Sequence, residues 1–416
     1  MSFRRHSRAN WPLIVLIMAL VVASGYLAYT KVVVKRIETP PTPAPTPTIS
    51  DGSKEFARAQ GLFRQGKLEE ALSAYQEAAS AASQGSSELS DLASALAAQG
   101  KMAESQARRQ EAHQAVVRTA SAYAGLGKVL VLRGRYGEAI EACNKALALD
   151  DRSHEAQAVL AMAHDWEGDY ERAVTAAQRA IELKTDYAEA YAYLAEAYAD
   201  QFRFDQALAA GLKAVELNAK SYDAQRNLGY VLEKKGNYNG AVVRYQKAIE
   251  LAPNLSYLHL GLGKNYRALG KYAEAVAAFQ RATEVDPKNP EAFDWLGRGH
   301  FDQRNYELAL QSFEKALELQ PRYALAQGHI GWVYYFAPAK DYARAAEAFK
   351  KALEMGGLDQ ARTAEFQAEL GLSLAYQGKC KDARAALKKA QELLVAVSDP
   401  DLVEAVAKGL KLCEGK

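Results

Sequence analysis

Apolar and small positions recur every 34 residues between residues 52 and 323. Within each period the apolar side chains are spaced by three, four and seven residues, which is the spacing of one helix face. A glycine interrupts this spacing in the middle of most periods, so each period predicts two short antiparallel helices joined by a tight turn. The interrupting place is occupied by Gly66, Gly100, Gly134, Gly168, Phe202, Gly236, Gly270 and Arg304.

The register predicts a row of stacked helix pairs, with units that start near residues 52, 86, 120, 154, 188, 222, 256, 290, 324 and 364. The unit at 86 has Arg109 at a place that is otherwise aromatic, so we expect it to pack loosely. Two extra residues enter the unit at 324 near residues 337–339. A further amphipathic stretch over 398–416 is predicted to cap the last pair, because stacked repeats leave an apolar face bare at their end.

Three units follow one consensus especially closely, with small and aromatic residues at fixed places: NLGYVLEKKGNYNGAVVRYQKAIELAP, GLGKNYRALGKYAEAVAAFQRATEVDP and WLGRGHFDQRNYELALQSFEKALELQP. This pattern resembles the tetratricopeptide repeat (TPR), and the resemblance covers residues 52–397. It implies an all-α fold, a superhelical solenoid of about ten helix pairs with a C-terminal capping helix. Members of this family mostly act as non-catalytic scaffolds for protein interactions, which is the function that the resemblance implies.

The N-terminal segment differs in character from the repeats, because residues 11–30 carry no charged side chain. Twenty helical residues span about 30 Å, the thickness of the hydrocarbon core of a bilayer. We therefore expect a basic tail over 1–10 and one transmembrane helix over 11–34. A cleaved signal peptide is the alternative, although residues 22–25 make a poor cleavage site.

A Pro/Thr-rich linker over residues 35–51 follows the apolar segment, with a proline-dense stretch at 39–48. Proline fixes φ and removes a backbone donor, so the linker is predicted to be an extended spacer. A Pro-rich ligand for a partner domain is the alternative. Basic residues on both sides of the apolar segment slightly favour a cytoplasmic N-terminus. We expect a single-pass protein of the bacterial inner membrane with its repeats in the periplasm.

Charge and motifs exclude several classes of function. The excess of basic residues lies in the first fifty positions, so the repeats offer no basic face and we expect no nucleic acid partner. The fragments at 125–128 and 261–264 resemble parts of phosphate loops, but they occupy equivalent places in two repeats and lack the other loop residues. No zinc-protease, nucleophile-elbow or Cys-x-x-Cys motif occurs. We expect no enzyme activity, no metal and no small-molecule cofactor.

The three cysteines support one specific hypothesis. Cys143 occupies a core place and is expected to be an inert buried thiol. Cys380 begins the last repeat helix and Cys413 ends the capping helix, so antiparallel packing would place them side by side. Outside the cytoplasm they could form a disulfide, and two reduced thiols are the alternative.

In the TPR family the first helices of successive units line a concave groove, and carrying those places over gives a candidate partner-binding surface. Arginines and large aromatics supply charge-assisted hydrogen bonds and anchoring area for a peptide. Packing between neighbouring repeats is the alternative role. The chaperone-type carboxylate clamp and the sugar-transferase asparagine ladder do not fit these places. The predicted groove residues are Arg226, Asn227, Tyr230, Lys264, Arg267, Trp295, Arg298, Phe301, His329, Trp332 and Tyr335.

Together these features predict a membrane-tethered, non-catalytic scaffold that binds a protein or peptide partner in its concave groove. The alternative is a structural subunit of an envelope secretion, pilus or polysaccharide-export apparatus. In that case the convex face or the N-terminal units would make permanent contacts.

Overall fold

The computed structural model describes residues 11–37, 49–394 and 399–415, in two units that divide after Ser50. The first unit contains helix α1 (Trp11–Ile37). Along it the apolar side chains of described placement, from Val15 to Leu27, are exposed. The predicted basic tail over 1–10 and residues 38–48 of the predicted linker lie outside the described residues.

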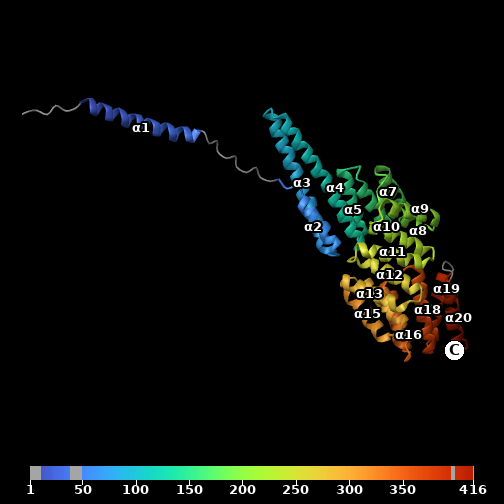
Figure 1. Ribbon diagram of the computed structural model, residues 1–416. Coiled ribbons are helices and arrows are strands. Elements are labelled where there is room, and N and C mark those ends of the chain that lie inside the picture. Colours follow the sequence, from blue (N-terminus) through green and yellow to red (C-terminus); the bar gives the residue numbers. More distant parts are fainter. Residues whose placement is uncertain (1–10, 38–48, 395–398, 416) are drawn as a thin grey trace, which may run out of the picture. The chain divides into compact units, whose positions relative to one another are not determined.

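The described part of the second unit consists of helices joined by short turns (Figure 1), as the all-α expectation requires. Its helices are α2 (Ser53–Arg64), α3 (Leu68–Ala98), α4 (Met102–Leu132), α5 (Tyr136–Leu149), α6 (His154–Glu167), α7 (Tyr170–Leu183), α8 (Ala188–Asp200), α9 (Phe204–Leu217), α10 (Tyr222–Lys234), α11 (Tyr238–Leu251), α12 (Ser256–Ala268), α13 (Tyr272–Val285), α14 (Pro290–Asp302), α15 (Tyr306–Leu319), α16 (Ala324–Phe336), α17 (Tyr342–Met355), α18 (Gln360–Tyr376), α19 (Cys380–Leu394) and α20 (Pro400–Leu412).

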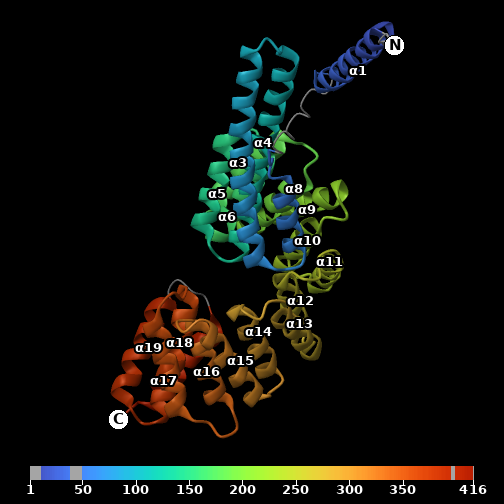
Figure 2. The same cartoon turned by 90° about the vertical axis from the view of Figure 1, so that its left-hand side faces the viewer.

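Two helices are longer than the 34-residue register predicts. The register placed unit boundaries near 86 and 120, but α3 and α4 each run through such a boundary as continuous helices of 31 residues. At later boundaries a proline such as Pro253 or a helix-ending Asp or Asn stops the second helix. Residues 82–85 and 116–119 contain none of these, so the helical hydrogen bonds continue. The expected short helix pair at 86–119 is therefore replaced by the end of one long hairpin, which projects beyond its neighbours in both views (Figures 1 and 2).

The helices form two layers because first helices contact first helices of the next unit. Thus α6 contacts α8, α8 contacts α10, and the contacts continue through α12 and α14 to α16. The second helices pack on the outside of their own pair. Small residues make this close approach possible, and Gly263 is one example, because a Cβ there would lie 2.4 Å from the Phe279 ring.

The superhelix closes on itself between its first pair and the turns near residues 254 and 286. The turn between α2 and α3 touches the turn between α11 and α12, where a Cβ on Gly66 would lie 2.0 Å from the carbonyl oxygen of Asn254. Arg133 at the end of α4 adds ion pairs to Glu69 at 2.6 Å and Asp286 at 3.0 Å. The first helix pair thus lies against segments that are distant in the sequence.

Helix α20 covers the last repeat. Its Leu402 and Val406 are buried with Ala364 and Leu387 of α18 and α19. The Asp399 side chain caps the helix by accepting a hydrogen bond from the backbone N–H of Leu402. The turn over 395–398 lies outside the described residues.

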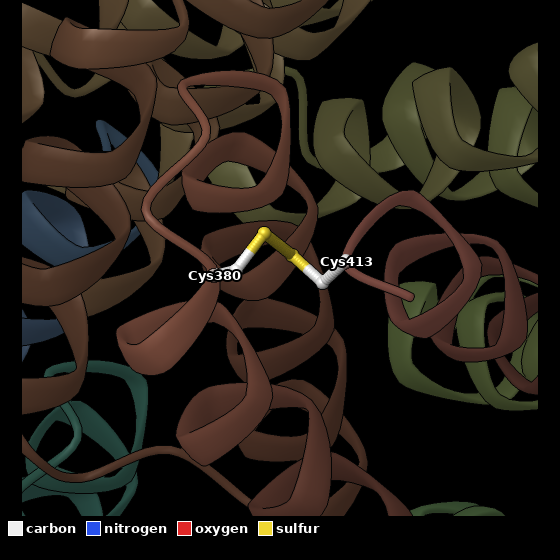
Figure 3. The surroundings of a disulfide bond; sticks show 2 residues. All are labelled: Cys380 and Cys413. Atoms are coloured by element: carbon white, nitrogen blue, oxygen red, sulfur yellow. A yellow bond between two sulfur atoms is a disulfide. The ribbon is translucent and has the colours of Figure 1, made fainter. Parts of the chain in front are cut away.

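A disulfide joins the beginning of α19 to the end of the α20 segment (Figure 3). Cys380 and Cys413 are bonded, with their Cα atoms 5.2 Å apart. The remaining cysteine, Cys143, is fully buried, and burial raises the pKa of its thiol to about 12. A thiol of that pKa stays protonated and is a poor nucleophile at neutral pH.

Among the described residues one helix, α4, is long and apolar enough to cross a bilayer by length and composition. However, 56% of its apolar stretch is buried inside the repeats, as in the core helix of a soluble domain. In α1 the described apolar stretch is Met18–Ala28, which is shorter than the 18 residues of a candidate membrane span. The predicted anchor over 11–34 therefore remains a prediction.

Candidate functional site

The inner surface of the N-terminal units is filled by side chains. Lys128 from α4 pairs with Asp223 from α10 at 2.6 Å, and their side chains are 18% and 5% exposed. The Lys128 ammonium also lies 4.9 Å from the centre of the Tyr222 ring and 5.8 Å from those of Tyr193 and Phe63. Closure of the superhelix therefore replaces an open groove with a packed axis.

The first predicted groove residues belong to this interior. Arg226 pairs with Glu196 at 2.5 Å, and the two side chains are 12% and 3% exposed. Asn227 is completely buried, and the Tyr230 hydroxyl donates to Asp200 at 2.6 Å. A partner segment cannot reach Arg226 or Asn227 in this arrangement, which corrects the expectation that they line a groove. Both side chains instead make contacts within the chain, because Arg226 pairs with Glu196 and also donates a hydrogen bond to the Asn227 side chain.

Buried acids complete this interior network. Asp165, Glu196 and Asp200 lie on neighbouring first helices, and Lys234 pairs with Asp200 at 2.8 Å. Burial, followed by the proximity of Glu196 and Asp200, raises the pKa of Asp165 far above its ordinary range. A protonated carboxyl can remain among like charges where a carboxylate would be repelled. The network therefore serves packing between α6, α8 and α10.

Two further predicted residues form ion pairs at the edge of the later units. The Lys264 ammonium lies 3.2 Å from Glu291 and 4.7 Å from the centre of the Trp295 ring. Arg267 forms a two-point contact with Asp302 on the next first helix. Both cations are thus paired within the chain.

The remaining predicted residues come together on α14 and α16, where they form what we call the inner cluster. The rings of Phe301 and Trp332 lie 6.1 Å apart, and Phe336 is 5.9 Å from Phe301. Phe336 is 48% exposed, so this aromatic row reaches the surface. We define the inner cluster as Trp295, Arg298, Phe301, His329, Trp332, Tyr335 and Phe336 of these two helices, together with Glu369 of α18, whose charge acts on Tyr335.

His329 holds the two helices of the cluster together. Its Nδ1–H donates to the Asp294 carboxylate across 2.6 Å, and both side chains are almost fully buried. The imidazole also lies 4.6 Å from the Trp332 ring and 5.3 Å from that of Phe313. This pair fixes the ring of Trp332, so His329 is a positioning residue of the cluster.

Glu369 on α18 was not among the sequence-predicted residues. Its Oε2 is buried with no hydrogen-bond partner among the described residues. Burial, then the neighbouring Glu365, raises the pKa of Glu369 to about 7, while Lys408 of α20 opposes this shift. The repeat register could have identified Glu369 as an inner-face residue, because it occupies the same place in its unit as Trp295 and His329. The shift of register near 360–363 obscured it.

A hollow of about 990 Å³ lies on the other side of α18, between α17 and α19. Lysines and acids alternate along it, and none of its lining residues carries a buried polar atom without a partner. Its neighbouring pair Lys351–Glu347 is closed at 2.8 Å. The inner cluster is the stronger candidate because it combines large rings with unsatisfied polar groups. The described residues include no group of three His, Cys, Asp or Glu side chains placed to hold a metal.

Comparison with known proteins identifies the fold family. Three tetratricopeptide repeat models match the chain, one over 159–222, 260–324, 296–359 and 330–400, one over 220–288 and one over 120–153. No curated protein matches the sequence.

The crystal structure of the APC/C hetero-tetramer Cut9-Hcn1 is 15% identical over 86% of this chain and 76% of that chain, with a TM-score of 0.58. The human IFIT1 dimer with m7Gppp-AAAA is 17% identical over 89% and 91% of the two chains, with a TM-score of 0.58. At these identities the likeness concerns the fold alone. The chain belongs to the tetratricopeptide repeat family.

Proposed function

We propose that this protein is a membrane-tethered scaffold that binds an extended segment of a partner protein at the inner cluster. The observation that carries this proposal is the aromatic row of Phe301, Trp332 and Phe336, which reaches the surface, whereas the first helices of the N-terminal units are sealed by the chain's own side chains. Aromatic side chains dominate binding energy at protein interfaces because they bury a large area with few rotatable bonds.

The surroundings of the cluster favour binding over packing alone. Trp295 is held by Phe279, with ring centres 5.7 Å apart, and by a hydrogen bond from its Nε1–H to Glu291 at 3.1 Å. Trp332 is held by His329. Because these rings are fixed before a partner arrives, little conformational entropy is lost on the side of the scaffold.

Helix α1 supports the tethering part of the proposal. Val22 and Tyr26 are each 69% exposed within their unit, and the other apolar side chains of described placement between Val15 and Leu27 are exposed to a similar degree. A helix of 27 residues is about 40 Å long, enough to cross a bilayer. The disulfide fits an oxidising compartment, so we place the repeats outside the cytoplasm, in the periplasm of a bacterial cell.

Site-specific photocrosslinking in cells tests the binding site. A photoreactive amino acid at Phe336 should capture a discrete partner, and one at Phe202 serves as the control, because Phe202 is 74% exposed in an outer turn. Trp332→Ala should weaken capture through Phe336 about tenfold or more without lowering helicity. Equal capture from both positions, or capture insensitive to Trp332→Ala, would remove the inner cluster from this role.

A second candidate function rests on the long hairpin of α3 and α4, which projects beyond its neighbours (Figures 1 and 2) and exposes Met102 by 65% near its tip. Such a hairpin would suit an assembly subunit of an envelope apparatus. Light scattering of the full chain in detergent distinguishes the two, since a stable large oligomer favours assembly and a monomer favours transient capture.

A further inference from the structure

Three carboxylates near Arg298, those of Asp294, Asp302 and Glu365, already have partners, so none of them pairs with the arginine. Asp294 binds His329 at 2.6 Å, Asp302 binds Arg267, and Glu365 binds Arg362 at 2.7 Å. No hydrogen bond or ion pair joins Arg298 to an acid among the described residues. The arginine lies on α14, one helical turn after Trp295 and one before Phe301.

The arrangement of Arg298 differs from that of an exposed surface arginine. Its guanidinium is 3.8 Å from the centre of the Trp295 ring, and its Nε is buried with no hydrogen-bond partner. Burial, followed by the nearby positive charge of Arg267, lowers the pKa of Arg298 to about 10. The side chain is still protonated at neutral pH, so the cluster holds a partly desolvated positive charge.

An unpaired buried charge destabilises a protein, and buried charges in proteins are normally paired. The other inner-face cations follow this rule, as Lys128 does with Asp223 and Arg226 with Glu196. Arg298 departs from it on α14, between Trp295 and Phe301. Stacking on Trp295 also fixes the plane of the guanidinium, which prepares it to receive an anion.

We propose that the inner cluster recognises an acidic segment, in which one carboxylate of the partner pairs with Arg298 while adjacent apolar side chains pack on Trp332 and Phe336. This inference rests on the proposed function. A carboxylate fits better than a phosphate group, because a doubly charged phosphate calls for several free donors and the adjacent Arg267 and Arg362 are already engaged. The carboxylate could come from an Asp or Glu side chain or from a chain terminus.

Three synthetic peptide pools test the inference with the full-length protein in a non-ionic detergent. Each pool is an acetylated heptapeptide mixture of apolar and aromatic residues. The first has a central Glu and an amidated end, the second has a central Gln and an amidated end, and the third has a central Gln and a free C-terminus. Binding is measured by fluorescence anisotropy. We expect the first or third pool to bind about ten- to a hundredfold more tightly than the second, and the tighter of the two identifies the source of the carboxylate.

Two substitutions separate recognition from a structural role. Arg298→Gln should abolish the preference for the acidic pool and leave the unfolding midpoint unchanged or higher, because it removes an unpaired charge. Arg226→Gln is the matched control. It should lower the midpoint by leaving Glu196 unpaired, while the preference for the acidic pool persists.

Equal binding of all three pools would overturn the inference, as would an Arg298→Gln variant that retains the preference. Binding of none of the pools would also overturn it. The proposed function would survive each of these results if Phe336 still captured a partner in cells, so the two failures can be told apart.

Discussion

Closure of the superhelix can be tested with two glycines that differ only in what surrounds them. Gly66 and Gly134 end first helices with φ values of 74° and 71°. A Cβ on Gly66 would lie 2.0 Å from the Asn254 carbonyl oxygen, whereas a Cβ on Gly134 would meet nothing within 4 Å. Changing each to alanine therefore imposes the same backbone strain but only one collision.

The expected magnitudes follow from this difference. A left-handed backbone costs an alanine about 1 to 2 kcal/mol, and both variants bear this cost. In Gly66→Ala the obstacle is a backbone carbonyl, which cannot rotate away as a side chain can, so the turn near Asn254 must move. Overpacking of this kind costs about 1 to 3 kcal/mol more. The two variants should therefore differ by that additional amount.

Urea unfolding gives the stability of each variant, and amide hydrogen exchange locates the change. Because repeat arrays can unfold in parts, the exchange data are essential. In Gly66→Ala the amides of the turn between α11 and α12 should lose protection, while in Gly134→Ala they should not. Equal destabilisation of the two variants, with the protection near Asn254 intact in both, would refute closure of the superhelix.

Three other predictions concern groups outside this contact. The folded protein holds the Glu369 proton more tightly than the unfolded chain does, so stability should fall as the pH rises from the ordinary value of 4.5 to about 7. Glu369→Gln should therefore be more stable than the parent protein above pH 7, by up to about 3 kcal/mol, and similar to it at about pH 4. If the free energies of unfolding of the two proteins differed by the same amount at every pH, this expectation would be contradicted. Thiol titration of the unfolded, unreduced protein should find only Cys143 free, and Cys413→Ser should destabilise the α19–α20 end by about 4 kcal/mol at most; three free thiols would argue against the disulfide. Val21→Arg in α1 should release the protein from membranes at a cost to insertion of about 3 kcal/mol, whereas Val243→Arg on an outer helix should leave it membrane-bound.

The amino-acid sequence alone determined most of the helix pairs and the family. Helices α5 to α16 begin and end where the 34-residue register places them, because each end depends on a local signal such as a left-handed glycine or a proline. The same local chemistry governs α3 and α4. Residues 82–85 and 116–119 contain no Pro, Asp or Asn, and Gly85 keeps a helical backbone, so both helices continue through the boundaries of the repeat register.

The tertiary structure decided which inner surfaces are free. Small rotations between neighbouring units add up until Gly66 meets the turn at Asn254, and no local pattern encodes that sum. For the same reason the sequence could not distinguish Arg226 from Arg298. Both are arginines on first helices, but Arg226 is sealed against Glu196, whereas the acids near Arg298 are bound to other side chains. Whether a charge is paired depends on distances between helices, and only the packed superhelix fixes those distances.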